Sequence, residues 1–562
     1  MAKQVSVEER EVAELREMLL DCRTRYGTKT AFREKKDGIY QDISYARFAT
    51  EAEALATVLS VRFSAGDRVL IIGDNSYRWA LSYMALTVLG AVPVPVDAMV
   101  RLKDLAEIIT KSEAKGVLYA PEERRKKKAF VGLAAVCFDK YPVFIAEGKR
   151  RLADRVGEND LAELDPNGLA AIFFTPGATK GVMLSHANIL TTVRGVAEAM
   201  AIGREDVFLS HLPLSHSYEC ICGLLAPLYL GATVAFAEGL SHLMRNMREV
   251  HPTCMVTLPF IAGALYRKIW QGIEARGNET KVRRRISISD PVRPLSARQA
   301  LKERLLAAER GCVGYSLNRL IVLGGGMDAA VQKGLRQLGI FTVQGYGVTE
   351  CAGLAAISHD DRYRDGAAGL PFADAVIDIY NEQPDGSGEI RYKGDNVMLG
   401  YLSDPERTQN ALRGGWYYTG DIGRIDAAGF LHVLGRRQNC IENASGRLIC
   451  PEELERLLCQ SPFIKEAVVV GVLNPETKDS EPAALILTDR AYLAEMFGDD
   501  LDGADPEIAV DEWIAHINEE LEPYQQIGLY ALRDKPFPRD RGGRVQRAKL
   551  AKEIAEAIRK AK

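Results

Sequence analysis

The sequence predicts an α/β fold: a large N-terminal domain of mainly parallel, helix-covered sheets with a small β subdomain, and a small mobile α/β C-terminal domain. Three observations support this prediction. Short apolar runs alternate with helical stretches in the first part of the chain, strands become short and turn-rich after Gly388, and a compact α/β pattern follows Arg437. Alternating strands and helices are typical of parallel sheets, because each parallel connection needs a crossover.

The strands of the predicted parallel sheets are short and apolar. They are expected at residues 68–73, 91–96, 116–119, 233–236, 255–258 and 319–323. Helices are expected at residues 79–89 and 328–338. Continuous apolar runs of this length suit strands that are buried on both faces.

The later part of the chain is predicted to hold the two smaller units. Short strands at residues 388–392, 424–426 and 430–433 indicate an antiparallel β subdomain over residues 388–434. The N-terminal domain is expected to span residues 1–437 and the C-terminal domain residues 438–562. In the latter we expect helices from Pro451 and Asp511 and strands at residues 467–472 and 483–487. The basic tail after Arg547 carries an apolar helical stripe that is expected to dock on its own domain.

Composition narrows the classes of protein. Among 562 residues, 47% are hydrophobic and 26% are charged, which excludes a wholly disordered chain. The 72 basic and 76 acidic residues give a net charge of -4, which argues against a nucleic-acid binder. The charged N-terminus and the lack of a long apolar run predict neither a signal peptide nor a membrane span.

Ten scattered cysteines favour reduced, buried thiols in a cytoplasmic protein. Basic runs at residues 124–128 and 283–285 are interpreted as solvated faces.

Two motifs suggest a phosphate-handling site. Residues 173–182 lead from an apolar run into a small loop with hydroxyl groups, glycines and Lys180. Such a loop can offer backbone N–H groups and a cation to phosphates. In residues 344–350, two glycines allow a ligand close to the backbone, Tyr346 can face a base, and Thr349 can donate to a phosphate. Glu350 can hold magnesium through oxygen.

Two further motifs lie in the turn-rich part. Asp421 follows Thr419 and Gly420, and a carboxylate at such a turn can take both hydroxyls of a ribose. Residues 435–439 form a polar junction. Singly, each motif also fits an ordinary surface turn.

Together and in this order, the motifs resemble the signature set of the adenylate-forming superfamily, which includes acyl-CoA synthetases, peptide-synthetase adenylation domains and luciferases. The resemblance runs from about residue 43 to Arg547. Residues 211–219 and 249–253 resemble the long-chain fatty acyl-CoA synthetase branch. The resemblance implies that a carboxylate first reacts with ATP to give acyl-AMP and pyrophosphate. The acyl group then passes to the thiol of coenzyme A.

The resemblance also implies roles for individual residues. It assigns the β- and γ-phosphates to a loop made of Thr175, Gly177, Thr179 and Lys180. It places adenine between two segments. Tyr346, with Gly347 after it, lies on one side, and Gly324, Gly325 and Gly326 line the other. It implies that Thr349 contacts the α-phosphate, that Glu350 binds Mg2+, and that Asp421 and Arg436 bind the ribose. It makes Gln438 the hinge, Gly446 part of the coenzyme A tunnel, and His216, Cys220 and Gly223 part of the acyl pocket. Peripheral membrane contact and a homodimer remain open expectations.

Three departures from the family pattern bear on activity. The phosphate loop is several residues shorter than the usual Thr-Ser-Gly-Thr-Thr-Gly-x-Pro-Lys-Gly-Val. Arg544 stands where the family has a lysine that holds the substrate carboxylate. An arginine for a lysine in a closed site is not a conservative change. At Gln438 and Asn439 the usual charges are absent.

Three hypotheses follow from these observations. The first is an active fatty acid–CoA ligase, with Lys180, Thr349, Glu350 and Arg544 as its catalytic residues. The second is a weak or inactive relative that binds nucleotide or acyl ligand while lacking transition-state stabilisation. The third is an adenylate-forming ligase that loads a carrier protein or an amine. Pyrophosphate release, and its dependence on coenzyme A, would separate the three.

Overall fold

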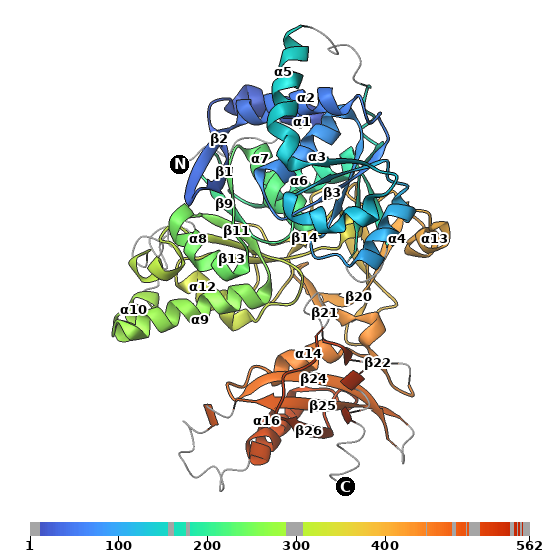
Figure 1. Cartoon of the computed structure of the whole chain (residues 1–562). Coiled ribbons are helices and arrows are strands. Elements are labelled where there is room, and N and C mark those ends of the chain that lie inside the picture. The colour runs from blue at the N-terminus through green and yellow to red at the C-terminus, as the bar shows by residue number, and fades with distance from the viewer. Residues whose placement is uncertain are drawn as a thin grey trace. The chain divides into compact units, whose positions relative to one another are not determined.

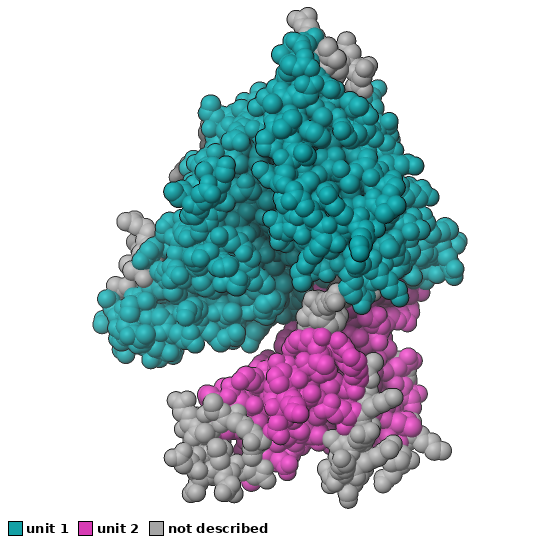
Figure 2. All heavy atoms as spheres, in the orientation of Figure 1, with its two compact units in different colours: residues 1–377, 392–417, 429–431 teal, residues 378–391, 418–428, 432–562 magenta. Residues whose placement is uncertain are grey.

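The computed structural model describes most of the chain. It covers residues 12–154, 162–175, 180–287, 307–445, 447–474, 479–489, 492–493, 506–539, 545–547, 549–550 and 553–554. The chain divides into two compact units, which are coloured separately in Figure 2. Unit 1 comprises residues 1–377, 392–417 and 429–431, and unit 2 comprises residues 378–391, 418–428 and 432–562. The functional boundary expected after residue 437 stays a prediction.

Unit 1 is built on a nine-stranded sheet with the order β15-β14-β13-β12-β11-β9-β10-β1-β2 (Figure 1). From β13 to β1 neighbouring strands run parallel, and the pairs at both edges are antiparallel. The strands are β1 (Thr30–Lys36), β2 (Ile39–Ser44), β9 (Val207–Ser210), β10 (Thr233–Phe236), β11 (Cys254–Thr257), β12 (Arg319–Val322), β13 (Phe341–Tyr346), β14 (Ala356–Ile357) and β15 (Leu370–Pro371). The mainly parallel sheet predicted from the apolar runs is confirmed.

A second, fully parallel sheet has the order β4-β3-β5-β6. Its strands are β3 (Arg68–Ile72), β4 (Val92–Val96), β5 (Gly116–Tyr119) and β6 (Ala134–Cys137). Helix α3 (Tyr77–Leu89) joins β3 to β4, and all of its residues except Arg78 are buried. It begins two residues before the predicted start, because the Ser76 side chain accepts a hydrogen bond from the Trp79 backbone and caps the helix. It ends at Leu89, and the following Gly90, with a φ of 82°, caps it.

A third sheet of unit 1 has the order β18-β8-β7 and is antiparallel. It contains β7 (Leu169–Phe174), β8 (Gly181–Ser185) and β18 (Gly400–Tyr401). The helices of unit 1 lie around the sheets (Figure 1): α1 (Leu15–Tyr26), α2 (Tyr45–Leu59), α4 (Leu102–Ser112), α5 (Tyr141–Ala153), α6 (His186–Ala199), α7 (Ala226–Leu230), α8 (Leu243–Val250), α9 (Pro259–Ala275), α10 (Glu279–Ser287), α12 (Ala329–Gln337) and α13 (Pro405–Ala411). Helix α2 packs on α1, α3 and α5, whereas α9 contacts α12.

The β subdomain forms a sheet with the order β16-β17-β20-β19, and β21 pairs with β20. Its strands are β16 (Val376–Tyr380), β17 (Gly388–Lys393), β19 (Leu412–Arg413), β20 (Trp416–Ile425) and β21 (Leu431–Arg436). The sequence motif around Asp421 was expected to form a turn, but it lies inside β20. Gly420, with a φ of 71°, lets the strand continue through a local irregularity that a residue with a Cβ would resist.

The C-terminal part of unit 2 has a three-stranded sheet of β24 (Ile464–Leu473), β25 (Ser480–Thr488) and β26 (Leu529–Arg533). Helices α14 (Pro451–Leu458) and α16 (Pro506–Glu520) contribute Leu454 and Ile514 to one apolar cluster. A second cluster holds Leu550 and Ile554 from the basic tail. The prediction that this apolar stripe docks on its own domain is confirmed for these two residues.

Two other predictions have mixed outcomes. All ten cysteines are free thiols, and seven are buried, whereas Cys312 and Cys440 are partly exposed and Cys459 is exposed. The basic run at residues 124–128 is not a uniformly solvated face. Lys126 is buried and contacts Glu123 and the Ala98 carbonyl, because the 3-10 helix η2 (Pro121–Phe130) turns this side chain inward. Among the helices of the described residues, none has the length and apolar character needed to cross a membrane.

Candidate nucleotide and acyl site

Two glycine-containing segments lie side by side at the carboxyl ends of parallel strands. Gly324, Gly325 and Gly326 follow β12, and Gly347 follows β13. The strands are in register, with Val322 opposite Gln344, and the Gln344 side-chain oxygen accepts a hydrogen bond of 3.0 Å from the Met327 backbone. Ligands of open α/β sheets bind at the carboxyl ends of the strands. The structure therefore brings together the two segments that were predicted to enclose adenine.

Close backbone contacts explain the glycine at position 347. A Cβ there would lie 2.0 Å from the carbonyl oxygen of Gly353, so no other residue fits without a backbone shift. Gly353 itself has a φ of 85° and packs on the backbone of Tyr218. Tyr346 is buried at the end of β13, whereas the glycines at 324–326 are exposed. The backbone is therefore tightly packed at Gly347, next to Tyr346, whereas the glycines at 324–326 are accessible to solvent.

Glu350 and Lys180 both contact Tyr401. Glu350 lies in the short 3-10 helix η7 (Thr349–Cys351), is 6% exposed, and accepts a hydrogen bond of 2.8 Å from the Tyr401 hydroxyl. The Lys180 ammonium lies 5.4 Å from the centre of the Tyr401 ring, within cation–π range. Burial, and then the neighbouring Glu350 carboxylate, raise the pKa of Tyr401, so its hydroxyl remains a donor.

Tyr401 was missed from the sequence. It stands in a short strand, β18, and no motif marks it. The pairing of β18 with β8 sets Tyr401 opposite Val182, two positions after Lys180. Only this long-range pairing puts an aromatic ring between the predicted phosphate-binding cation and the predicted magnesium-binding carboxylate.

The predicted phosphate loop joins two antiparallel strands. Phe174 of β7 pairs with Gly181 of β8, and the Thr175 backbone N–H donates to the Lys180 carbonyl at 3.1 Å. The two ends of the loop are therefore held together. Four predicted site residues, Gly177, Thr179, Gly446 and Arg544, lie outside the described residues.

In unit 2, the structure pairs the two residues predicted to bind ribose. Asp421 on β20 is buried, and its Oδ1 lies 3.2 Å from Nε of Arg436 at the end of β21. The Asp421 backbone N–H donates to the Thr419 hydroxyl at 3.1 Å, which in turn donates to the Ile390 carbonyl at 2.7 Å. Gln438 follows in the short 3-10 helix η8 (Arg437–Asn439). The buried carboxylate beside a half-exposed guanidinium is a polar pair suited to diol recognition.

We expect Asp421→Asn to raise the KM for ATP about 10-fold to 100-fold, because a hydrogen bond to a charged group contributes about 1.5–3 kcal/mol. Asp426→Asn is the matched control, since Asp426 follows the same strand and pairs with His432 at 2.9 Å. Titration of ATP against both variants, followed by thermal shift and by initial rates, checks this expectation. Equal ATP affinity in the two variants would remove Asp421 from the ribose site.

The predicted acyl-pocket residues lie on or next to a π-helix, η4 (Glu219–Leu225). Cys220 and Gly223 are buried in it, and the His216 ring stacks on Tyr218 with centroids 6.0 Å apart. π-helical turns are rare and often occur at functional sites. The structure thus gathers these residues on one segment, which is buried at Cys220 and Gly223 and packs through Tyr218 against Gly353 of the nucleotide loop.

Glu219 is a buried acid that sequence reasoning did not single out. One carboxyl oxygen accepts a hydrogen bond of 2.6 Å from Ser210, and the other has no hydrogen-bond partner among the described residues. The carboxyl group packs over Gly223, where a Cβ would come within 2.8 Å of it. Burial raises the pKa of Glu219 to about 8, so the group is mainly protonated at neutral pH. Burial also lowers the pKa of the neighbouring His211 to about 4.

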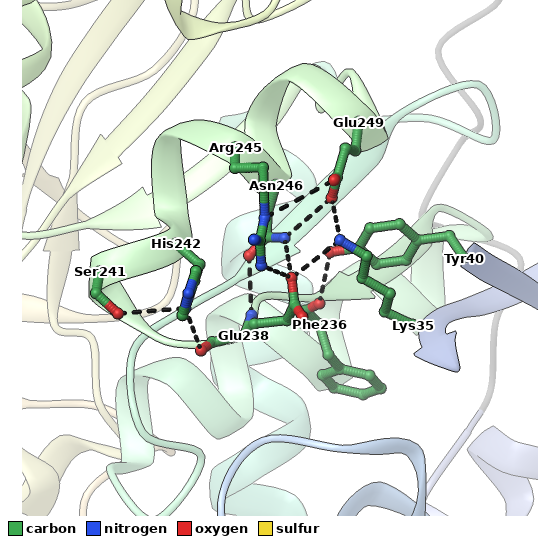
Figure 3. A network of polar contacts seen from close by, with 9 residues as sticks. All are labelled: Lys35, Tyr40, Phe236, Glu238, Ser241, His242, Arg245, Asn246 and Glu249. Atoms are coloured by element: carbon green, nitrogen blue, oxygen red, sulfur yellow. Dashed lines mark hydrogen bonds and ion pairs between the residues drawn. The ribbon is translucent and has the colours of Figure 1, made fainter. Parts of the chain in front are cut away.

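A charged network near β10 accounts for Glu249, which belongs to one of the segments that carried the family resemblance. Figure 3 shows Lys35 between Glu238 and Glu249. The Lys35 ammonium lies 3.1 Å from a carboxylate oxygen of Glu238 and 2.7 Å from one of Glu249. Arg245 of α8 contacts Glu238 at 2.7 Å. The network ties the β1–β2 hairpin to α8. Because each carboxylate is already engaged by cations of this chain, the role of Glu249 here is structural.

The fold is α/β, and glycine-containing segments lie at the carboxyl edge of its parallel sheet, where enzymes of this fold class bind ligands. The family model described as AMP-binding enzyme matches residues 21–402, and this protein belongs to that family. Among curated proteins, the chain is 26% identical over 468 residues to the long-chain-fatty-acid–CoA ligase FadD15 of Mycobacterium bovis, covering 78% of this chain and 77% of that protein. It is 26% identical over 490 residues to fatty acyl-CoA synthetase A of Dictyostelium discoideum, covering 79% and 72%.

Solved structures agree with this fold. The fatty acyl CoA synthetase of Mycobacterium tuberculosis superposes with a TM-score of 0.67 at 20% identity, covering 97% of this chain and 99% of that one. ATP-bound MatB from Rhodopseudomonas palustris superposes with a TM-score of 0.74 at 22% identity, covering 96% and 98%. The predicted fold class and the predicted adenylate-forming family are both confirmed.

Proposed function

We propose that this protein activates a fatty acid with ATP and transfers the acyl group to coenzyme A. The Lys180–Tyr401–Glu350 arrangement is the observation that carries the proposal. It links the loop predicted to hold phosphates with an acid that can bind a divalent cation, beside the glycine-lined edge of the parallel sheet. The names of the relatives, which are fatty acyl ligases, support the substrate class.

In the first step, a substrate carboxylate oxygen attacks the α-phosphorus of ATP, and the bond to pyrophosphate breaks. Lys180 would stabilise the charge of the leaving phosphates and Thr349 would donate to the α-phosphate. Tyr346 would face adenine, and Asp421 with Arg436 would hold the ribose. In the second step, the thiol sulfur of coenzyme A attacks the acyl carbonyl, AMP leaves, and the thiol proton is lost. Gln438 would be the hinge between the two steps, and Gly446 would line the path of the thiol.

The residues present fit a magnesium ion. Glu350 offers a hard carboxylate oxygen, which is the ligand type that Mg2+ prefers, and Tyr401 occupies Oε1 as a neutral donor. Bound there, the ion would offset the negative charge of the phosphates. Glu350 itself is held in place by its backbone, since its carbonyl accepts a hydrogen bond of 2.8 Å from the Met398 N–H.

A weak or inactive relative is the second candidate, and two sequence features favour it. Only four residues separate Thr175 from Lys180 in the phosphate loop, and Arg544 replaces the lysine of the family pattern. A shorter loop offers fewer donors to the leaving pyrophosphate. Such a protein would still bind nucleotide or acyl ligand.

Pyrophosphate release tests these candidates. Purified protein is given ATP, magnesium and fatty acids from short to long, with and without coenzyme A. Release that rises with coenzyme A and peaks at one chain length supports the proposed ligase. Acyl-AMP without a coenzyme A product indicates a carrier-protein or amine ligase. No release with any acid, together with thermal stabilisation by ATP or acyl-CoA, supports the inactive relative.

The variant Arg544→Lys is expected to raise the adenylation rate several-fold. A lysine ammonium is a compact point charge, whereas the guanidinium is larger and presents its donors in a planar fork. Pyrophosphate release under single-turnover conditions measures the effect. Arg539→Lys, a few positions earlier in the chain and ion-paired with Glu466 at 2.9 Å, is the matched control. A lower rate in Arg544→Lys would mean that the site is adapted to arginine.

A further inference from the structure

Cys440 and Cys450 face each other across a short antiparallel ladder of unit 2. Strands β22 (Ile441–Glu442) and β23 (Leu448–Ile449) pair with Ile441 opposite Ile449, so the two cysteines occupy the next opposed positions. Their sulfur atoms lie 3.5 Å apart. Opposed residues in antiparallel strands have Cα atoms about 4.5–5.5 Å apart, which lies within the range that a disulfide spans. A bond between the sulfurs therefore needs only a small side-chain movement.

The surroundings hold this pair in place. Cys450 is buried in an apolar cluster with Ile422 and Leu434, and Cys440 packs against the same cluster from its partly exposed position. The Cys440 thiol also lies 3.4 Å from the carbonyl oxygen of Arg436, to which it can donate. The two thiols thus differ in access: one meets solvent and the other is enclosed.

We propose that Cys440 and Cys450 are a modification site, at which a small-molecule disulfide such as oxidised glutathione converts the two thiols into a reversible intramolecular disulfide. Neither cysteine is among the residues assigned to nucleotide or acyl binding, although Cys440 contacts the backbone of Arg436. The thiol chemistry does not depend on the proposed ligase activity.

The reaction proceeds by two thiol–disulfide exchanges. The Cys440 thiolate attacks one sulfur of oxidised glutathione, which forms a mixed disulfide and releases one glutathione thiolate. Cys450 then loses its proton and attacks the Cys440 sulfur, and the second glutathione leaves. Two protein thiols are oxidised and one glutathione disulfide is reduced to two thiols. The hydrogen bond with Cys440, then burial, raise the pKa of Cys450, so partly exposed Cys440 is the thiol that meets the oxidant first.

A disulfide between Cys440 and Cys450 would restrain the backbone near Gln438. Oxidation removes the S–H group that faces the Arg436 carbonyl and ties residue 440 to the residue that precedes α14. Gln438, the proposed hinge, lies between Arg436 and Cys440. The restraint therefore falls on the segment next to the hinge.

Peptide mapping tests the inference on the full-length protein. After incubation with oxidised glutathione and blocking of the remaining thiols, trypsin cuts after Arg437, Arg447 and Arg456. The expected result is one linked species of peptides 438–447 and 448–456, which separates on treatment with a dithiol. The count of reactive thiols in the unfolded protein should fall by the two residues of the pair.

Two variants complete the test. Cys440→Ser should abolish the linked species, and Cys459→Ser, which removes the exposed cysteine on the neighbouring peptide, should leave it intact. Recovery of Cys440 only as a glutathione adduct or as a free thiol in the wild type would overturn the inference. A linkage of Cys440 to Cys459 in place of Cys450 would overturn it as well.

Discussion

Glu350→Gln is expected to lower magnesium-dependent pyrophosphate release by at least about 100-fold, the scale of effect that follows loss of one electrostatic group in a catalytic site. The amide keeps the size of the side chain and can still accept the Tyr401 hydrogen bond of 2.8 Å. It has no negative charge, so the site loses its attraction for a divalent cation. The measurement is pyrophosphate release over a range of magnesium concentrations.

The variant Tyr401→Phe is the companion to this experiment. It removes the hydroxyl that orients Glu350 but leaves the carboxylate and the ring that faces Lys180. A smaller loss, about 10-fold, is expected from one hydrogen bond to a charged group.

A second readout, independent of turnover, is the part of the ATP-induced thermal shift that requires magnesium. Glu350→Gln should abolish this part. Unchanged rates and an unchanged magnesium-dependent shift would exclude Glu350 as the metal ligand.

Glu219→Gln is expected to remove a fall in folding stability that the wild type shows as pH rises. The pKa of Glu219 is about 8 in the folded chain, against an ordinary value of 4.5. Between these values the unfolded chain loses the proton while the folded chain keeps it, so the free energy of unfolding decreases with pH. The stabilising contribution of protonated Glu219 is fully present below pH 4.5, the ordinary pKa of a glutamate, and is lost as the pH rises towards about 8.

The size of this effect follows from the pKa shift. From about pH 5.5 to about pH 7.5, the wild type should lose on the order of 2–3 kcal/mol relative to the variant. Urea unfolding of both proteins over this range measures the difference, and His211, which also titrates, is common to both. Glu122→Gln, at an exposed acid, is the matched control and should keep the wild-type fall. Parallel pH profiles for wild type and Glu219→Gln would show that the carboxyl is not buried as described.

The sequence predicted the elements whose signals are local. The apolar runs at β3, β5, β10 and β12 lie within a residue of their expected bounds, because a strand buried on both faces must be continuously apolar. The motif at residues 419–421 was misread as a turn, although Gly420 lies within a ten-residue strand. A glycine with a positive φ occurs both in turns and in strand irregularities, and only the pairing with neighbouring strands shows which of the two is present.

The same contrast holds for the site. Lys180, Tyr346 and Glu350 could be named from the sequence, since glycines and charged groups near strand ends mark close ligand approach. Tyr401 could not, because its importance comes from a pairing with β8 across more than two hundred residues of chain. Glu219 looked like any glutamate in a polar motif, and its burial in a π-helix under Ser210 is what alters its protonation.

The sequence by itself determined the family, the α/β class and most of the residues expected to meet nucleotide, because motif order and apolar patterning are properties of the chain read along its length. Only the tertiary structure decided which side chains touch. It set Tyr401 between Lys180 and Glu350, paired Asp421 with Arg436, enclosed Glu219, and brought the sulfurs of Cys440 and Cys450 to 3.5 Å. Each of these depends on strand register or burial, which are set by packing between segments and leave no local trace in the sequence.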